Sequence, residues 1–161
     1  MPLVIERIVT NTSPLLALTK MQILDAIGKL PFEFVCPTEV ETEILVGANQ
    51  GYEVKIPAWL NVLSLSSALS PLAVASLDVG EAAVIQLALE QNIKTVCIDE
   101  LKGRRAATAV GLQVVGSLGL LGKAKTLGLI TEAKPLIEKA KVSGIYFDES
   151  LIEKFLNSLG E

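Results

Sequence analysis

A chain of 161 residues is long enough to bury the core of one domain, and half of its residues are hydrophobic while only 4% are aromatic, which indicates a core of aliphatic side chains. The absence of histidine excludes Ser-His-Asp and Cys-His catalysis and any histidine-ligated metal, so a catalytic metal would have to be held by oxygen. The net charge of -4, taken over the whole chain, argues against nucleic acid as a partner.

The hydrophobic pattern predicts short strands that alternate with helices along a single domain, residues 1–161. In chain order we expect a strand at 4–9, a helix at 14–27 with a break near Met21, a strand at 32–36, a helix at 38–46, an irregular stretch at 47–57, a strand at 61–65, a helix at 78–91, a strand at 94–98, a helix at 103–110, a strand at 113–115, and helices at 117–127, 135–140 and 149–159. This alternation predicts an α/β fold, a three-layer α/β/α sandwich around a central, mostly parallel sheet.

The last helix carries an apolar stripe, which favours packing on its own domain over contact with a partner. The stripe consists of Leu151, Ile152, Phe155, Leu156 and Leu159. Cys36 and Cys97 form no C-x-x-C pair, so we expect two small buried hydrophobic side chains rather than a disulfide or a zinc site. No apolar run reaches the roughly 18 residues of a membrane helix, and the first residues show no signal-peptide pattern, so we expect a cytoplasmic protein.

Basic residues gather in one part of the chain despite the net negative charge. Residues 94–125 contain six basic side chains against Asp99 and Glu100; the six are Lys94, Lys102, Arg104, Arg105, Lys123 and Lys125. Such a stretch could attract a phosphate backbone. It is equally typical of a solvated helix face whose charges are balanced by acids from elsewhere in the fold.

Four polar residues fall where the predicted strands end or the following helices begin: Asn11, Glu43, Glu81 and Asp99. The ligand crevice of an open parallel sheet forms at the carboxyl ends of its strands. At 100° per residue, Glu81 shares the apolar stripe of its helix, and Glu43 lies on the same side as Val40 and Ile44. A carboxylate on the packed side of a helix needs a cation, a donor or a helix dipole beside it.

Each acid also has a purely structural interpretation. Asp78 and Glu81 have the spacing of a capping box, Glu43 could pair with a lysine at the edge of its helix, and Asp99 could be the N-cap of the next helix. Their common location is what indicates a site. Carboxylates crowded together repel one another unless a cation such as Mg²⁺ or Mn²⁺ lies between them, and phosphodiester hydrolysis is the reaction that such a centre supports.

Three separated segments resemble, in order and spacing, the motifs of PIN-domain nucleases: residues 8–18, 78–88 and 97–107. The resemblance is closest to a branch related to the VapC toxins, and it extends through residues 111–116 and 128–130. It implies that Asn11, Glu43, Glu81 and Asp99 correspond to the acidic quartet that binds metal. Glu100 would replace or support Asp99.

The same resemblance implies a PIN-like fold and an endoribonuclease that depends on Mg²⁺ or Mn²⁺. Residues expected to contact RNA are Ser13, Lys102, Arg104 and Arg105. It further implies a homodimer and a small antitoxin as partner. Asn11 departs from the family, which usually has aspartate there, and asparagine offers an oxygen without negative charge. The alternative is therefore a non-catalytic PIN scaffold that binds RNA or a partner protein.

Overall fold

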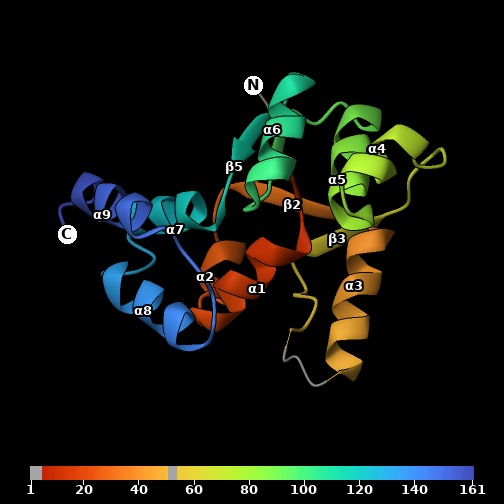
Figure 1. Cartoon of the computed structure of the whole chain (residues 1–161). Helices are drawn as coiled ribbons and strands as arrows, with labels where there is room; N and C mark the ends of the chain where they lie inside the picture. The colour runs from red at the N-terminus through yellow and green to blue at the C-terminus, as the bar shows by residue number, and fades with distance from the viewer. Residues whose placement is uncertain (1–4, 51–53) are drawn as a thin grey trace.

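The computed structural model describes residues 5–50 and 54–161, in which a five-stranded, all-parallel sheet carries helices on both faces (Figure 1). The elements are β1 (Glu6–Thr10), α1 (Thr12–Lys20), α2 (Leu24–Gly28), β2 (Phe32–Pro37), α3 (Thr38–Asn49), β3 (Leu60–Leu63), α4 (Pro71–Ser76), α5 (Val79–Glu90), β4 (Thr95–Cys97), α6 (Leu101–Ala109), β5 (Gln113–Val115), α7 (Ser117–Thr126), α8 (Lys134–Val142) and α9 (Glu149–Ser158). The predicted α/β architecture is confirmed.

The strand order β3-β2-β1-β4-β5 places β1 at the centre of the sheet and next to β4, although these two strands are far apart in sequence. Ile8 pairs with Thr95 and Thr10 pairs with Cys97. From β1 the chain moves outward to β2 and then β3, whereas from β4 it moves outward the opposite way, to β5. The carboxyl ends of β1 and β4 therefore form the switch point of the sheet, where open α/β folds place their ligands.

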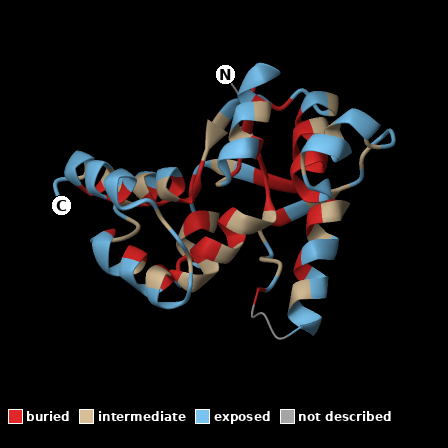
Figure 2. Ribbon diagram, in the orientation of Figure 1, coloured by how far each residue is buried: buried red, intermediate tan, exposed pale blue. Residues whose placement is uncertain are grey.

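Helix α5 is the most deeply covered helix on its side of the sheet. It packs on β1, β2 and β4, and most of its residues from Gly80 to Ala88 are buried, as Figure 2 shows in red. Small side chains such as Ala82 and Ala83 allow this close approach. Helix α6 lies beside α5, while α1 contacts α2, α7 and α8 in the other layer, below the sheet in Figure 1.

Most predicted elements are confirmed with shifted ends. The expected break near Met21 separates α1 from α2, and Gln22 there adopts a left-handed φ of 61°. Helix α3 continues to Asn49, beyond its predicted end. The predicted strand at 4–9 and irregular stretch at 47–57 include residues 4 and 51–53, which lie outside the described residues.

Helix α4 was not predicted, because its apolar side chains are exposed or half-buried and give no periodic pattern.

Both cysteines are free and fully buried, as expected. No helix among residues 5–50 and 54–161 is long and apolar enough to span a membrane.

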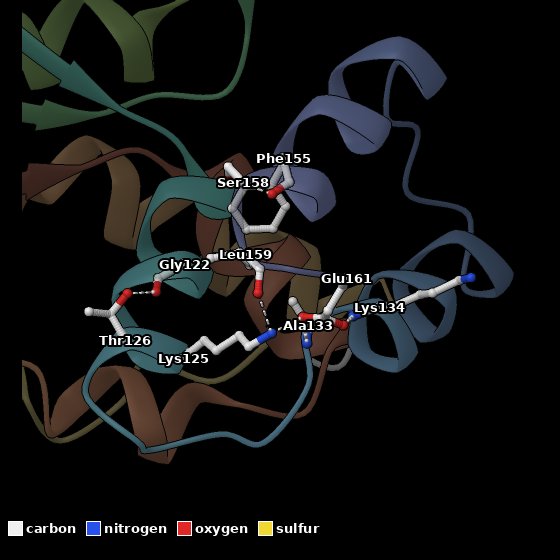
Figure 3. Close-up of polar contacts among 9 residues, drawn as sticks. All are labelled: Gly122, Lys125, Thr126, Ala133, Lys134, Phe155, Ser158, Leu159 and Glu161. Carbon is white, nitrogen blue, oxygen red and sulfur yellow. Dashed lines mark hydrogen bonds and ion pairs between the residues drawn. The ribbon is translucent and has the colours of Figure 1, made fainter.

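The end of the chain is fastened to α7 and α8 by a group that we call the C-terminal clamp: Glu161, Lys125, Ala133 and Lys134 (Figure 3). The Glu161 carboxylate accepts hydrogen bonds from Lys125 Nζ at 2.7 Å, from the Ala133 amide at 2.9 Å and from the Lys134 amide at 3.0 Å. Ala133 is the N-cap of α8 and Lys134 is its first residue, so the carboxylate also caps that helix.

Helix α9 packs with the face that its apolar stripe predicts. Ile152 and Leu156 are buried, and the Phe155 ring lies so close to Gly122 of α7 that an added Cβ there would be 3.1 Å from it. Leu151 is the exception, since it remains 54% exposed. The predicted packing of α9 on its own domain is confirmed for the rest of the stripe.

Candidate metal centre

Asn11 lies at the switch point of the sheet, directly after β1. Its backbone N–H donates to the Cys97 carbonyl at 3.0 Å, so it joins the ends of β1 and β4. The residue is only 3% exposed, and its side-chain Oδ1 has no hydrogen-bond partner among the described residues. An unpaired polar atom in such a position is costly, which points to a ligand that would use it.

Glu81 enters the same region from the first turn of α5. It is 3% exposed, and its Oε2 also lacks a hydrogen-bond partner in the described part of the chain. Asp78 is the N-cap of α5 and accepts a hydrogen bond from the Glu81 amide at 2.7 Å. The capping interpretation is thus confirmed for Asp78, yet it leaves one carboxylate oxygen of Glu81 without a partner.

Three carboxylates converge between the starts of α5 and α6. One oxygen each from Asp78, Glu81 and Glu100 lies within 4.8 Å of the others. No ion pair among the described residues neutralises any of them. Burial and, after it, the neighbouring carboxyl groups of Asp78 and Glu100 together raise the pKa of Glu81 to about 7. We call these three residues the acidic cluster.

Glu43 of α3 borders the acidic cluster. Its Oε2 accepts a hydrogen bond from Thr12 Oγ1 at 2.9 Å, and its Oε1 lies against Gly80. Burial raises the pKa of Glu43, and the carboxylates of Asp78 and Glu100 act in the same direction, against the hydrogen bond from Thr12. No described lysine pairs with Glu43, so the alternative of an edge ion pair is wrong.

Glycines allow these carboxylates to approach the helix backbones. A Cβ added at Gly80 would lie 2.1 Å from Glu43 Oε1, and one added at Gly103 would lie 2.3 Å from Glu81 Oε2. Both distances are far below a normal contact. Any side chain at either position would displace a carboxylate of the candidate site.

Asp99, at the end of the β4 segment, faces a different set of groups. Its Oδ1 accepts from the Ser117 amide at 2.7 Å and its Oδ2 from Ser117 Oγ at 2.8 Å, at the start of α7. The N-cap of α6 is Glu100, so the alternative that Asp99 caps the next helix is wrong. Asp99 instead binds the first residue of α7, and the group of three close carboxylates contains Glu100 in its place.

The basic stretch is divided between several roles. Arg104 donates to the Ile98 carbonyl at 2.8 Å, and Lys125 belongs to the C-terminal clamp. Lys102 and Arg105, by contrast, are exposed on α6 and form no ion pair with a described residue. Ser13 is half-buried in the first turn of α1. Two basic side chains of α6 therefore remain exposed to solvent.

The donors present fit a hard divalent cation. All of them are oxygens: the carboxylates of the acidic cluster, the Glu43 carboxylate and the side-chain amide oxygen of Asn11. Two of these oxygens are buried without a hydrogen-bond partner among residues 5–50 and 54–161. Mg²⁺ and Mn²⁺ prefer such ligands and relieve the repulsion among them. Asp78 and Ser117 were not predicted as parts of the site. The position of Asp78, three residues before Glu81 at the start of one helix, was the available signal.

A family model described as a PIN domain matches residues 7–161, well over half of the chain. No curated protein matches the chain.

Proposed function

Because the chain belongs to the PIN-domain family, a family with a nuclease-type fold, we propose that it is a divalent-metal-dependent endoribonuclease whose cation is held by the acidic cluster. The observation that supports this most strongly is the meeting of Asp78, Glu81 and Glu100 beside the switch point, with no basic partner among the described residues. When bound, the cation would activate water as the nucleophile and offset negative charge on the phosphate.

The chain's own residues would divide the work between them. Glu81 and Asn11 supply buried oxygens to the cation, while Asp78 and Glu100 supply exposed ones that leave space for a phosphate. Glu43, whose carboxylate accepts a hydrogen bond from Thr12, adds a further negative charge on the α3 side of the site. Lys102 and Arg105 attract the RNA backbone, which the acidic cluster alone would repel.

The test is cleavage of a mixed RNA pool by the purified protein with Mg²⁺ or Mn²⁺, and with EDTA. We expect Glu81→Gln and Glu100→Gln to lower the rate at least about 100-fold, the equivalent of about 3 kcal/mol. Glu138→Gln is the matched control, since Glu138 is an exposed carboxylate of α8. Cleavage that survives EDTA or both cluster substitutions would rule out the proposal.

A non-catalytic scaffold that binds RNA or a protein is the competing outcome of that test. It predicts RNA binding that EDTA does not change, without cleavage. The finer proposals, a cytoplasmic toxin that forms a homodimer and is neutralised by a small antitoxin, rest on the likeness to VapC relatives. Growth arrest on expression of the wild type but not of Glu81→Gln would support the toxin proposal, and light scattering of the purified protein would test the dimer.

A further inference from the structure

We propose that Ser117 is a positioning residue that holds Asp99 away from the cation, so that Glu100 supplies the ligand from the end of β4. The inference rests on the proposed function only in that a cation binds the acidic cluster. It concerns two carboxylates that are adjacent in sequence. Both oxygens of Asp99 accept hydrogen bonds, whereas the side chain of Glu100 is exposed.

Both oxygens of Asp99 are already used. The Ser117 amide and hydroxyl donate to Oδ1 and Oδ2 at 2.7 and 2.8 Å, and Ser117 itself is only 1% exposed. Since Ser117 is the first residue of α7, the carboxylate also lies at the positive end of a helix. Short bonds from an amide and a hydroxyl to a carboxylate are among the stronger hydrogen bonds in proteins.

The surroundings of Asp99 are fixed on a second side. A Cβ added at Gly116 would lie 2.8 Å from both Asp99 Oδ1 and Arg104 Nη1, and the same Arg104 nitrogen donates to the Ile98 carbonyl. Gly116 thus lets the carboxylate and the guanidinium lie close to the chain at the end of β4. To reach the acidic cluster, Asp99 would have to give up both of its bonds to Ser117.

Glu100 has none of these constraints. Its side chain is exposed and forms no hydrogen bond with a described residue, and one of its oxygens lies within 4.8 Å of those of Asp78 and Glu81. The backbone at Glu100 is extended, with φ -75° and ψ 135°, and neighbouring side chains of an extended chain point to opposite sides. Holding Asp99 toward α7 therefore turns Glu100 toward the cation.

The experiment measures Mn²⁺ affinity by calorimetry for the wild type, Glu100→Gln, Asp99→Asn, Ser117→Ala and the double variant of Ser117→Ala with Glu100→Gln. We expect Glu100→Gln to weaken Mn²⁺ binding about tenfold or more. Asp99→Asn should stay within about threefold, because its amide can still pair with both groups of Ser117. In the Ser117→Ala background, Asp99 has lost the hydroxyl bond to its Oδ2 and keeps only the amide bond to Oδ1, so its Oδ2 can take part in replacing Glu100 and Glu100→Gln should cost about threefold or less.

Ser117→Thr keeps a hydroxyl and should restore the full effect of Glu100→Gln, which a merely structural role of Ser117 would not predict. An Asp99→Asn loss as large as that of Glu100→Gln would overturn the inference, and so would an unchanged Glu100→Gln penalty in Ser117→Ala. If Ser117→Ala does not fold, the comparison of Asp99→Asn with Glu100→Gln still decides. A wild type that binds Mn²⁺ without cutting RNA refutes the nuclease alone, whereas one that binds no Mn²⁺ refutes both proposals.

Discussion

Buried polar side chains are few in the described part of the chain, and most of them surround one place. The five are Thr10, Asn11, Glu81, Thr95 and Ser117, and all but Thr95 lie at the end of β1 or in the first turn of a helix beside the candidate centre. Thr95 has its own partners, Glu6 and Gln113. Because folding alone gains nothing from buried oxygens that lack a partner in the described part of the chain, their position at Asn11 and Glu81 supports the proposed metal site.

Asn11→Asp should strengthen the cation site and weaken the metal-free protein. The substitution adds a negative charge at a position that is 3% exposed and directly precedes Thr12, whose hydroxyl donates to the Glu43 carboxylate. We expect Mn²⁺ affinity to rise about tenfold, while stability without metal falls by about 1–3 kcal/mol at neutral pH. Calorimetric titration and thermal unfolding with and without EDTA measure the two effects. A variant that loses stability equally with and without Mn²⁺ would contradict the prediction.

Gly103→Ala should impair metal binding more than its small size suggests. The new Cβ would lie 2.3 Å from Glu81 Oε2 and 2.9 Å from Ile98 Cγ2, so Glu81 must move. We expect about tenfold weaker Mn²⁺ binding, with a stability loss of about 1–3 kcal/mol. Gly119→Ala is the matched control, because its Cβ would meet only Val115, at 2.6 Å. It should lose stability and retain Mn²⁺ affinity.

At the scale of the elements, the sequence predicts best those helices that are buried by the sheet. The angular position of Glu81 on the apolar stripe of α5 is confirmed by its burial. The carboxylate of Glu43 also lies against a packed neighbour, Gly80 of α5, as its angular position predicts, although the residue as a whole stays exposed, like Leu45 and Val46 further along α3. Helix α4 begins with the recognisable pair Ser70-Pro71, but none of its residues is buried.

The C-terminal clamp gives a prediction for α7, α8 and α9 together. Burial raises the pKa of Glu161, but the hydrogen bonds from Lys125, Ala133 and Lys134 outweigh this and lower it to about 2, from an ordinary value of 4.5. A lowered pKa in the folded state means that the stabilisation is complete above about pH 4.5 and is lost as the pH falls toward 2. Glu161→Gln should therefore lower the Tm by about 2–4 °C at pH 7.

The measurement is thermal unfolding of Glu161→Gln and wild type between pH 2 and pH 7. The difference between their Tm values should shrink below about pH 4.5. Glu153→Gln, which changes an exposed carboxylate of α9, should leave the Tm unchanged at every pH. A pH-independent difference for Glu161→Gln would show that the clamp acts through shape rather than charge.

At the scale of the whole molecule, the alternation of strands and helices was sufficient to predict the parallel sheet, and the sheet predicts where the site lies. The composition of the acidic cluster was not predictable to the same degree. Whether Asp99 or Glu100 faces Glu81 depends on Ser117, which follows the next strand of the sheet and is invisible in the local pattern around Asp99. Long-range contacts of this kind leave no periodic signal in a single sequence.

Divalent cations should stabilise the entire fold, because the acidic cluster joins α5 to α6 across the switch point. A cation at 100 times its dissociation constant adds about 2.7 kcal/mol, which corresponds to a Tm increase of about 5 °C or more. Thermal unfolding with Mn²⁺, Mg²⁺ or EDTA measures this. Glu81→Gln should abolish the increase, and Glu138→Gln should preserve it. An equal increase in both variants would place the responsible cation elsewhere.

The reactivity of the Cys97 thiol can report how often the ends of β1 and β4 separate. Its carbonyl accepts a hydrogen bond from the backbone N–H of Asn11. Its thiol is fully buried, and burial and the charge of Asp99 raise the pKa of that thiol. An alkylating reagent needs an accessible thiolate, so Cys97 can react only when the strand ends separate. In a Cys36→Ser background, the rate of Cys97 alkylation would measure how often the strand ends separate. A cation bound at the acidic cluster should lower that rate.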